Sequence, residues 1–328
     1  MNPFSYTQAD GLETALLDRS GAPGTAYLGG GTNLLDHIKL GVERPDRLVD
    51  VRKIGCDEIT ALPGGGLRLG ATATNSAVAY HPAVRKSFPV LAEAILAGAS
   101  PQLRNVATTA GNLLQRTRCY YFRDGISPCN KREPGSGCAA LNGFNRIHAV
   151  LGTSDQCIAT HPSDMDVALM ALDAVVRLRG VQGERVVPLG DFYVAYGTDP
   201  AKENVLEPGE LITAVDVPAT AWFARSHYLK ARERASYEFA LSSAAVALDL
   251  QQGVIRDCRI ALGGVATKPW RAHAAEAALR GAKPDEAAFQ AAADAELKPA
   301  VARAHNGFKI ELCRRVIVQA LQTTASLA

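Results

Sequence analysis

The sequence has almost no net charge and contains no basic block. In 328 residues there are 35 Lys and Arg against 33 Asp and Glu, a formal charge of +2. Without a Lys/Arg run or a low-complexity tail, nothing in the composition indicates binding to nucleic acid or to an anionic membrane. An apolar content of 47% is ordinary for a globular protein. The length is enough for two or three modest domains.

Long apolar runs are also missing. No segment approaches the roughly 18 apolar residues that would suggest a membrane span. The best candidate, residues 167–176, is short and is interrupted by Asp173. The first ten residues, MNPFSYTQAD, contain neither a charged nor an apolar export region. We therefore expect no membrane span and no export signal, which favours the cytoplasm unless a partner carries the chain elsewhere.

Two common nucleotide-binding motifs are missing, although glycine is abundant near the start. The segment 29–35, GGGTNLL, lacks the last glycine of G-x-G-x-x-G and the Gly-Lys-Ser/Thr of a P-loop. Its glycines would still let the backbone approach a pyrophosphate, and Thr32 and Asn33 add side-chain donors. Glycine-rich segments are more often simple turns, so this one alone is weak evidence for a dinucleotide.

A second segment rich in small residues is more informative. Residues 102–113 read QLRNVATTAGNL. We interpret 108–112 as a turn with room for a flat ligand or its diphosphate, to which Thr108, Thr109 and Asn112 offer hydrogen bonds. The alternative is a tight loop that packs against the first domain.

Two charged residues are further candidates for contact with a bound dinucleotide. Asp164 follows Ser163, and its carboxylate could accept hydrogen bonds from ribose hydroxyls. From the residues alone, an acid that interacts with a helix dipole is the better explanation of Asp164. Lys230 lies in a strand-like run, where a cation near the N1–C2=O edge of a flavin would stabilise the reduced anion. A solvated strand lysine is the more common case.

Closely spaced cysteine pairs are missing as well. Four of the seven cysteines fall in one segment with the spacing C-x9-C-x8-C-x18-C. They are Cys119, Cys129, Cys138 and Cys157. Four thiolates match the ligand count of an iron–sulfur cluster or a structural zinc, yet both usually use C-x2-C pairs. Widely spaced ligands need a long loop around the metal, and this irregular segment could supply it.

Other readings of the cysteine segment stay open. Two disulfides are the main alternative, although a chain of this size rarely needs them. His148 and His161 are alternative ligands. Nearby cations would offset the charge of a thiolate-ligated cluster, or are simply solvated; they are Arg116, Arg118, Arg123, Lys131 and Arg132. We interpret the three remaining cysteines as buried small hydrophobes; they are Cys56, Cys258 and Cys313.

The patterns divide the chain into three regions, 1–57, 58–222 and 226–328, with the cysteine loop 116–160 inserted in the second. A hairpin is expected around the glycines at 64–66. Strands are expected at 25–28, 46–51, 59–62, 67–69, 174–178, 227–231, 243–250 and 259–262. Helices are expected at 7–18, 75–80, 90–96, 163–173, 272–279, 285–295 and 307–321. The third region is predicted to be α+β, with a few antiparallel strands covered by helices.

Two helices carry more specific signals. Ser163 precedes Asp166 by three residues, which is typical of a helix cap. In the last helix an apolar face is predicted from residues four apart, namely Phe308, Leu312, Val316 and Ala320.

In combination, four segments resemble a known family. The segments LGGGTNLL, QLRNVATTAGNLLQ, ATHPSDM and LKARERASYEFALSSAAVAL occur in this order. They are similar to the FAD-binding medium subunit of the xanthine dehydrogenase or molybdenum hydroxylase family. The resemblance covers nearly the whole chain and implies an α+β fold with a two-lobed FAD domain of the PCMH/VAO type and a C-terminal flavoprotein domain. Ala110 departs from the pattern, because many members have glycine there.

The resemblance also implies cofactors and the residues that hold them. It places the FAD diphosphate at 29–35 and 108–112, the ribose region at Asp164 and the isoalloxazine near Lys230. The implied FAD contacts are Leu28, Gly29, Gly30, Gly31, Thr32, Asn33, Leu34, Leu35, Thr108, Thr109, Gly111, Asn112, Asp164, Leu211 and Lys230. Most members lack a cysteine loop, but two subtypes carry one with a 4Fe–4S cluster. This chain resembles the periplasmic aldehyde oxidoreductase subtype more than the 4-hydroxybenzoyl-CoA reductase subtype, which makes the four clustered cysteines the implied ligands.

The function implied is electron transfer within a complex. A large molybdopterin subunit would oxidise an aldehyde, and a small subunit with two 2Fe–2S clusters would pass electrons to FAD and an external acceptor. By the same resemblance, a partner with a twin-arginine signal would carry the folded complex into the periplasm. Two alternatives remain: a free-standing flavin oxidase, for which no His or Tyr motif is evident, and a scaffold with zinc or disulfides.

Overall fold

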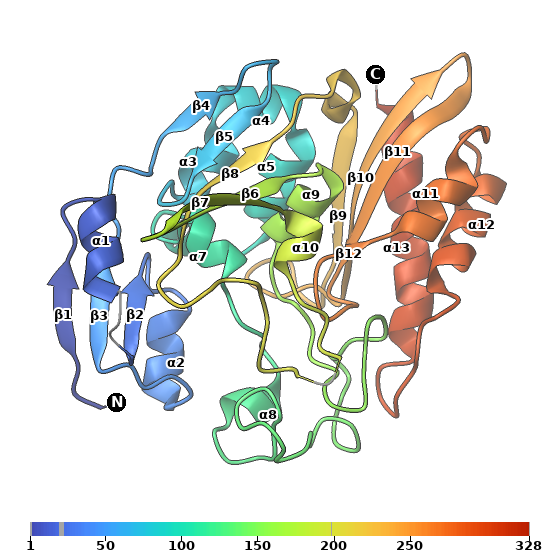
Figure 1. Cartoon of the computed structure of the whole chain (residues 1–328). Helices are drawn as coiled ribbons and strands as arrows, with labels where there is room; N and C mark the ends of the chain where they lie inside the picture. Colours follow the sequence, from blue (N-terminus) through green and yellow to red (C-terminus); the bar gives the residue numbers. More distant parts are fainter. Residues whose placement is uncertain (1, 20–22, 198, 328) are drawn as a thin grey trace.

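Three β-sheets follow one another along the chain, and the cysteine loop lies below them in the view of Figure 1. The computed structural model describes residues 2–19, 23–197 and 199–327. Within these ranges no helix has both the length and the apolar character needed to cross a bilayer.

The first sheet has three parallel strands in the order β1 (Ser5–Gln8), β3 (Arg47–Asp50) and β2 (Thr25–Leu28). Helix α1 (Leu12–Arg19) packs on it through Ala15 and Leu16, which belong to the same core as Val49. Helix α2 (Leu34–Leu40) begins inside the glycine-rich segment and ends at Gly41, whose φ of 73° suits the left-handed cap. The glycine segment is therefore a strand-to-helix connection.

The second sheet is antiparallel, in the order β4-β5-β8-β6-β7. Its strands are β4 (Ile59–Ala61), β5 (Leu67–Gly70), β8 (Leu211–Val217), β6 (Val175–Gly180) and β7 (Gly183–Pro188). The hairpin expected around the glycines at 64–66 is confirmed. Accompanying helices are α3 (Asn75–Tyr80), α4 (Pro82–Ser87), α5 (Pro89–Ala97), α6 (Pro101–Arg104), α7 (Thr109–Leu113), α9 (Asp164–Ala171) and α10 (Leu189–Phe192). The cap predicted for α9 is confirmed, because Ser163 Oγ accepts from Asp166 N–H at 3.1 Å.

The third sheet is also antiparallel, in the order β12-β11-β10-β9. Its strands are β9 (Ser226–Ala231), β10 (Ser242–Gln251), β11 (Val254–Gly263) and β12 (Trp270–Arg271), with the 3-10 turn η1 (Ala221–Ala224) before them. Helices α11 (His273–Leu279), α12 (Glu286–Leu297) and α13 (Phe308–Ser326) lie to one side of it (Figure 1). These antiparallel strands and helices confirm the predicted α+β class.

The face of α13 differs in part from the prediction. Val316 and Ala320 are buried as expected, but Phe308 is 37% exposed. Cys313 and Ile317 are buried instead, so the apolar stripe runs along the side of the helix that packs on β10 and β9.

Other local predictions were wrong in identifiable ways. Residues 109–112 belong to helix α7 and do not form a turn, because Thr108 caps the helix by accepting from Gly111 N–H at 3.1 Å. The helix expected from residue 7 begins only at Leu12, since residues 5–8 pair with β3. Strand β8 was not predicted.

The cysteine loop contains almost no regular structure, as expected. Its one helix is α8 (Tyr120–Arg123). The loop runs between the second sheet and the C-terminal domain, to which it is joined by backbone hydrogen bonds. Val150 and Leu151 both donate to Val265 O, and Val301 donates to Val150 O at 2.8 Å. The loop is thus anchored on the domain that follows it.

Candidate functional site

The glycine segment and the loop before α7 touch through their backbones. A Cβ at Gly30 would lie 2.1 Å from Val106 O, and a Cβ at Gly29 would lie 2.9 Å from Thr108 Oγ1. Gly31 has a φ of +73°. Any larger side chain at Gly30 would force the two segments apart. Sequence analysis predicted both segments as one site, and the structure brings them together.

Two adjoining cavities open at this contact. The smaller has a volume of about 530 Å³ and the larger about 1080 Å³. Thr32, Asn33 and Gly111 line both of them. Among the predicted contacts, the smaller is lined by Gly29, Gly30, Gly31, Thr32, Asn33, Leu34, Thr108, Gly111 and Leu211. The larger is lined by Thr32, Asn33, Gly111, Asn112 and Asp164.

Four predicted contacts line neither cavity, and three of them lie behind the walls: Leu28, Leu35 and Thr109. Thr109 is fully buried and donates from Oγ1 to Ala73 O at 3.1 Å, which fixes α7. Leu28 and Leu35 are the side chains that a Cβ at Gly31 would meet. Both side chains pack against the backbone of the glycine segment at Gly31.

Unused polar groups face the cavities. Within the described chain, Thr72 Oγ1 and Asn75 Oδ1 are buried without a hydrogen-bond partner, and they belong to residues that line the smaller and the larger cavity. No hydrogen bond among the described residues uses the backbone N–H of Gly30, Gly31 or Thr32. Since unpaired buried polar groups are costly, this set suits a polar ligand with oxygens near the glycine segment.

The larger cavity also contains backbone strain. Ala99 and Tyr237 both line it, with φ values of +51° and +56°. Non-glycine residues rarely adopt this conformation, and they do so preferentially at functional sites.

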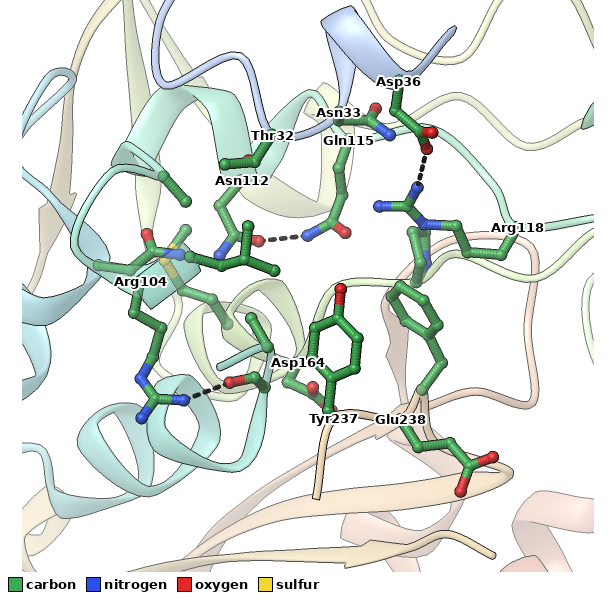
Figure 2. Close-up of a pocket in the computed structure, with 18 of the residues that line it drawn as sticks. Thr32, Asn33, Asp36, Arg104, Asn112, Gln115, Arg118, Asp164, Tyr237 and Glu238 are labelled. Carbon is green, nitrogen blue, oxygen red and sulfur yellow. Dashed lines mark hydrogen bonds and ion pairs between the residues drawn. The ribbon is translucent and has the colours of Figure 1, made fainter. Parts of the chain in front are cut away.

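Side chains from distant segments close the larger cavity (Figure 2). Gln115 Nε2 donates to Asn112 Oδ1 at 2.5 Å on one wall. On another, Arg118 pairs with Asp36 at 3.4 Å. Burial and the neighbouring Arg123 lower the pKa of Arg118 to about 10, which still leaves a full positive charge at neutral pH. The walls therefore combine amide hydrogen bonds with a cation.

Asp164 and Lys230 pair with each other. Lys230 Nζ lies 2.7 Å from Asp164 Oδ2, and the two side chains are 4% and 9% exposed. Tyr228 Oη donates to the other carboxylate oxygen at 2.6 Å, and Lys230 also donates to Ala97 O at 3.1 Å. The pair joins α9 to β9 at the edge of the larger cavity. Each residue was predicted to contact the flavin separately, and no contact between them was foreseen.

A second buried acid lies behind Asp164. Asp166 is fully buried and accepts from Tyr193 Oη at 2.7 Å, while His161 Nε2 lies 3.5 Å away. Burial raises the pKa of Asp166 to about 7, although the hydrogen bonds from Tyr193 and Ser163 oppose the shift. Burial also lowers the pKa of His161 to about 3, so the imidazole is neutral. The buried acid Asp166 therefore has a neutral imidazole as its neighbour.

The four cysteines of the loop come together in one buried group, the cysteine cluster. Cys119, Cys129 and Cys157 share a small core with Phe122 and Tyr196, and Cys138 packs against it. Cys129 and Cys138 also face each other in an antiparallel β-bridge. Burial raises the pKa of the Cys119 and Cys157 thiols to about 12.

The cysteines are free thiols, and no two of the seven form a disulfide in the described chain. The alternative of two disulfides is therefore not found. Within the described ranges, no three His, Cys, Asp or Glu side chains stand close enough together to hold a single metal ion. The cysteine cluster thus gathers four thiols around one core.

Cations of the loop are held by neighbouring segments. Arg116 pairs with Glu203 at 2.8 Å and with Glu43, and its backbone N–H donates to Asn33 Oδ1 at 2.9 Å. Lys131 is buried, 3.2 Å from Glu203 and 3.7 Å from the centre of the Tyr196 ring. Burial would raise the pKa of Glu203, but Lys131 and Arg116 lower it overall.

The other three loop arginines are also paired or hydrogen-bonded. Arg118 and Arg123 pair with Asp36 of α2, and Arg132 donates to the carbonyls of Tyr121 and Phe122. Arg118 and Arg123 therefore tie the loop to α2, whereas Arg132 joins two parts of the loop to each other. Lys131 is buried beside Tyr196, in the core that contains the cysteines.

Two family models match the chain, one after the other. The FAD binding domain in molybdopterin dehydrogenase matches residues 2–220, and the CO dehydrogenase flavoprotein C-terminal domain matches residues 227–324. The chain belongs to the FAD-binding subunits of the molybdopterin dehydrogenase family. This confirms the predicted family, an oxidoreductase component that binds FAD and transfers electrons within a multi-subunit complex.

Individual relatives extend the match across the chain. An aldehyde oxidoreductase FAD-binding subunit, PaoB, of Escherichia coli (strain K12) is 49% identical over 323 residues, which is 98% of this chain and 98% of PaoB. The glyceraldehyde dehydrogenase medium chain of Sulfolobus acidocaldarius is 27% identical over 281 residues, 85% of this chain and 82% of its own.

Two solved structures share the fold. Carbon monoxide dehydrogenase from Hydrogenophaga pseudoflava has a TM-score of 0.77 at 25% identity, covering 99% of this chain and 98% of its own. Quinoline 2-oxidoreductase from Pseudomonas putida 86 has the same TM-score at 23% identity, covering 99% and 97%; this second likeness concerns the fold alone.

The residues present fit FAD. The glycine segment offers close backbone approach and unused N–H groups, and the two cavities adjoin there. Sequence analysis missed several lining residues, among them Asn75, Arg104, Gln115, Tyr237 and Phe239. Asn75 directly follows Thr74, the cap of α3, so the local sequence indicates a helix start there and not a ligand contact. Arg104 and Gln115 flank the predicted segment without a motif of their own, and Tyr237 reaches the site from another domain.

Proposed function

We propose that the chain is the FAD- and 4Fe–4S-containing electron-transfer subunit of a molybdenum-dependent aldehyde oxidoreductase. The observation that carries this proposal is the 49% identity to the E. coli aldehyde oxidoreductase subunit over 98% of both chains. Electrons would come from an aldehyde-oxidising molybdopterin subunit through a 2Fe–2S subunit. They would reach FAD and leave to an external acceptor.

The 4Fe–4S cluster rests on the cysteine cluster. All four predicted ligands lie in or against one buried core, together with the buried cation Lys131. A single zinc needs its sulfurs about 2.3 Å from one point. A cluster of four irons and four sulfides is a wider body, and its thiolates stand further apart. The support for the cluster is that all four cysteines share one buried core.

The roles of the FAD contacts follow from their positions. The glycine segment and Thr108 would hold the diphosphate, because their donors face the smaller cavity. Lys230 and Asp164 form a buried ion pair without net charge at the edge of the larger cavity. We infer that the pair positions α9 and β9 around the flavin, and that the lysine charge is shared with Asp164.

The test asks whether electrons from an aldehyde reach the flavin only when the partner subunits are present. The complex with its molybdopterin and 2Fe–2S subunits should bleach the flavin band when an aldehyde is added without oxygen. The chain alone should not respond to the aldehyde but should still be bleached by dithionite. Aldehyde turnover by the isolated chain would favour a free-standing flavin oxidase instead. A response of the complex to hydroxybenzoyl-CoA and not to aldehydes would favour the reductase-like alternative.

Location in the periplasm is part of the same proposal and is supported by the resemblance alone. Fractionation of cells that express all subunits should find the chain with the periplasmic fraction. Deletion of the partner's twin-arginine signal should return it to the cytoplasm.

A further inference from the structure

One histidine of the cysteine loop is in direct contact with the cysteine cluster. His148 is 1% exposed, and its Nε2 lies 3.1 Å from Sγ of Cys119. This is within hydrogen-bonding range for sulfur. Sequence analysis considered His148 as an alternative ligand, but four cysteines already complete the ligand set of a 4Fe–4S cluster.

Cys119 Sγ is the one side-chain atom among the described residues that hydrogen-bonds the imidazole, and the Asn145 backbone is its other polar neighbour. Its second nitrogen, Nδ1, is buried without a partner. One face of the ring lies near Tyr121, with ring centres 6.2 Å apart. A neutral imidazole has one N–H, and that proton is best placed on the nitrogen that has an acceptor. Because a thiolate has no proton of its own, Nε2 must carry the proton for these two atoms to form a hydrogen bond.

The backbone that carries this ring is clamped by the C-terminal domain. Lys309 is fully buried, and its Nζ donates to Ile147 O at 3.1 Å, His148 O at 3.0 Å and Gly264 O at 2.5 Å. An ammonium has three donors, and all three are used. Asn306 Nδ2 donates to the next carbonyl, Ala149 O, at 3.0 Å. The position of the ring is thus set by α13 and its preceding turn.

We propose that His148 donates a hydrogen bond to the Cys119 thiolate, that Lys309 positions it, and that this bond raises the reduction potential of the cluster. The inference rests on the proposed 4Fe–4S cluster. The reduced cluster carries one more negative charge than the oxidised cluster, and a hydrogen bond to a ligand sulfur stabilises the more negative state. No other donor among the described side chains lies within hydrogen-bonding distance of Cys119 Sγ.

The test is a potentiometric titration of the iron-loaded, full-length chain, followed by the EPR signal of the reduced cluster. His148→Phe keeps the ring and removes the donor. We expect the reduction equilibrium to shift about tenfold toward the oxidised form, about 59 mV for one electron, with iron and flavin contents unchanged. His148→Gln, which can still donate, should recover part of the shift.

Two further variants separate positioning from general damage. Lys309→Met should lower the potential in the same direction by a smaller amount, although Lys309 does not touch sulfur. His305→Phe is the matched control, because His305 is exposed and packs against Phe144 without contacting a cysteine. It should leave the potential unchanged.

The possible outcomes are distinct. An iron-loaded His148→Phe variant with the original potential would overturn the inference while leaving the cluster in place. An unsubstituted protein that holds no iron would overturn the proposed cluster itself. Should the variant lose its iron, pulsed EPR of unsubstituted protein labelled with ¹⁵N-histidine decides: a histidine nitrogen coupling supports the hydrogen bond, and its absence overturns it.

Discussion

Lys230 and Asp164 lie 66 positions apart in the sequence and form an ion pair of 2.7 Å at the edge of the larger cavity. The pair joins the start of helix α9 to strand β9 and therefore links the FAD domain to the C-terminal domain. Because Tyr228 and Ala97 supply the remaining hydrogen bonds, both charges are satisfied without a ligand.

Removal of one partner should therefore destabilise the fold. In Lys230→Met the Asp164 carboxylate stays buried without its cation, and we expect a loss of about 3 kcal/mol in the free energy of unfolding. Denaturant titration measures it. In a double-mutant cycle, Lys230→Met combined with Asp164→Asn should cost less than the sum of the single losses. Additive losses would contradict a direct pair.

The contact at Gly30 predicts a specific effect on flavin binding. In Gly30→Ala the new Cβ meets Val106 O, so the glycine segment must move away from the loop before α7. We expect loss of most of the flavin and about 1–3 kcal/mol of stability. Gly11→Ala is the control, since nothing lies within 4 Å of its Cβ. Flavin content per chain is the measurement, and equal content in both variants would argue against the contact.

Asp166 predicts a pH-dependent stability. Burial raises its pKa from 3.8 to about 7 in the folded protein, so the carboxyl stays protonated there while the unfolded chain ionises. The stability from this group is complete below about pH 4 and is lost as the pH rises to about 7.

Asp166→Asn removes that titration. Between pH 5 and pH 8 the variant should gain about 2 kcal/mol relative to the unsubstituted protein. Denaturation at both pH values tests this, with Asp155→Asn as control because Asp155 is 96% exposed. A pH-independent difference for Asp166→Asn would show that the carboxyl is ionised throughout.

The cysteine cluster predicts that iron and flavin separate. Cys129→Ser should remove iron and leave FAD bound, because the cluster core and the cavities share no cysteine. Cys258→Ala is the control: Cys258 lies in the C-terminal core, and the variant should keep both cofactors. Loss of FAD together with iron from Cys129→Ser would show that the loop supports the whole domain.

Elements with local signals were predictable from the sequence. The glycine hairpin between β4 and β5, the Ser163 cap and the irregular cysteine loop all follow from nearby residues. Strand β8 was missed although four of its seven residues are β-branched, because it pairs with β5 and β6 from distant parts of the chain. Thr108 was read as part of a turn since small residues suit a turn, whereas its hydroxyl caps a helix.

The site was predictable as a set of segments but not as a set of contacts. The meeting of Gly30 with Val106, the Lys230–Asp164 pair and the Lys309 clamp on the cysteine loop each join residues from separate elements. No local pattern encodes such contacts, because they arise from the packing of three sheets. The resemblance to a family indicated which residues contact the cofactors, and the structure shows which contacts hold those residues in place.

The most direct test of the account is the visible absorption spectrum of the purified chain, with iron analysis before and after acid release of the flavin. We predict flavin bands together with about four irons per chain. Flavin without iron would contradict the cluster and leave an FAD subunit with four free thiols. A colourless protein would contradict the account as a whole.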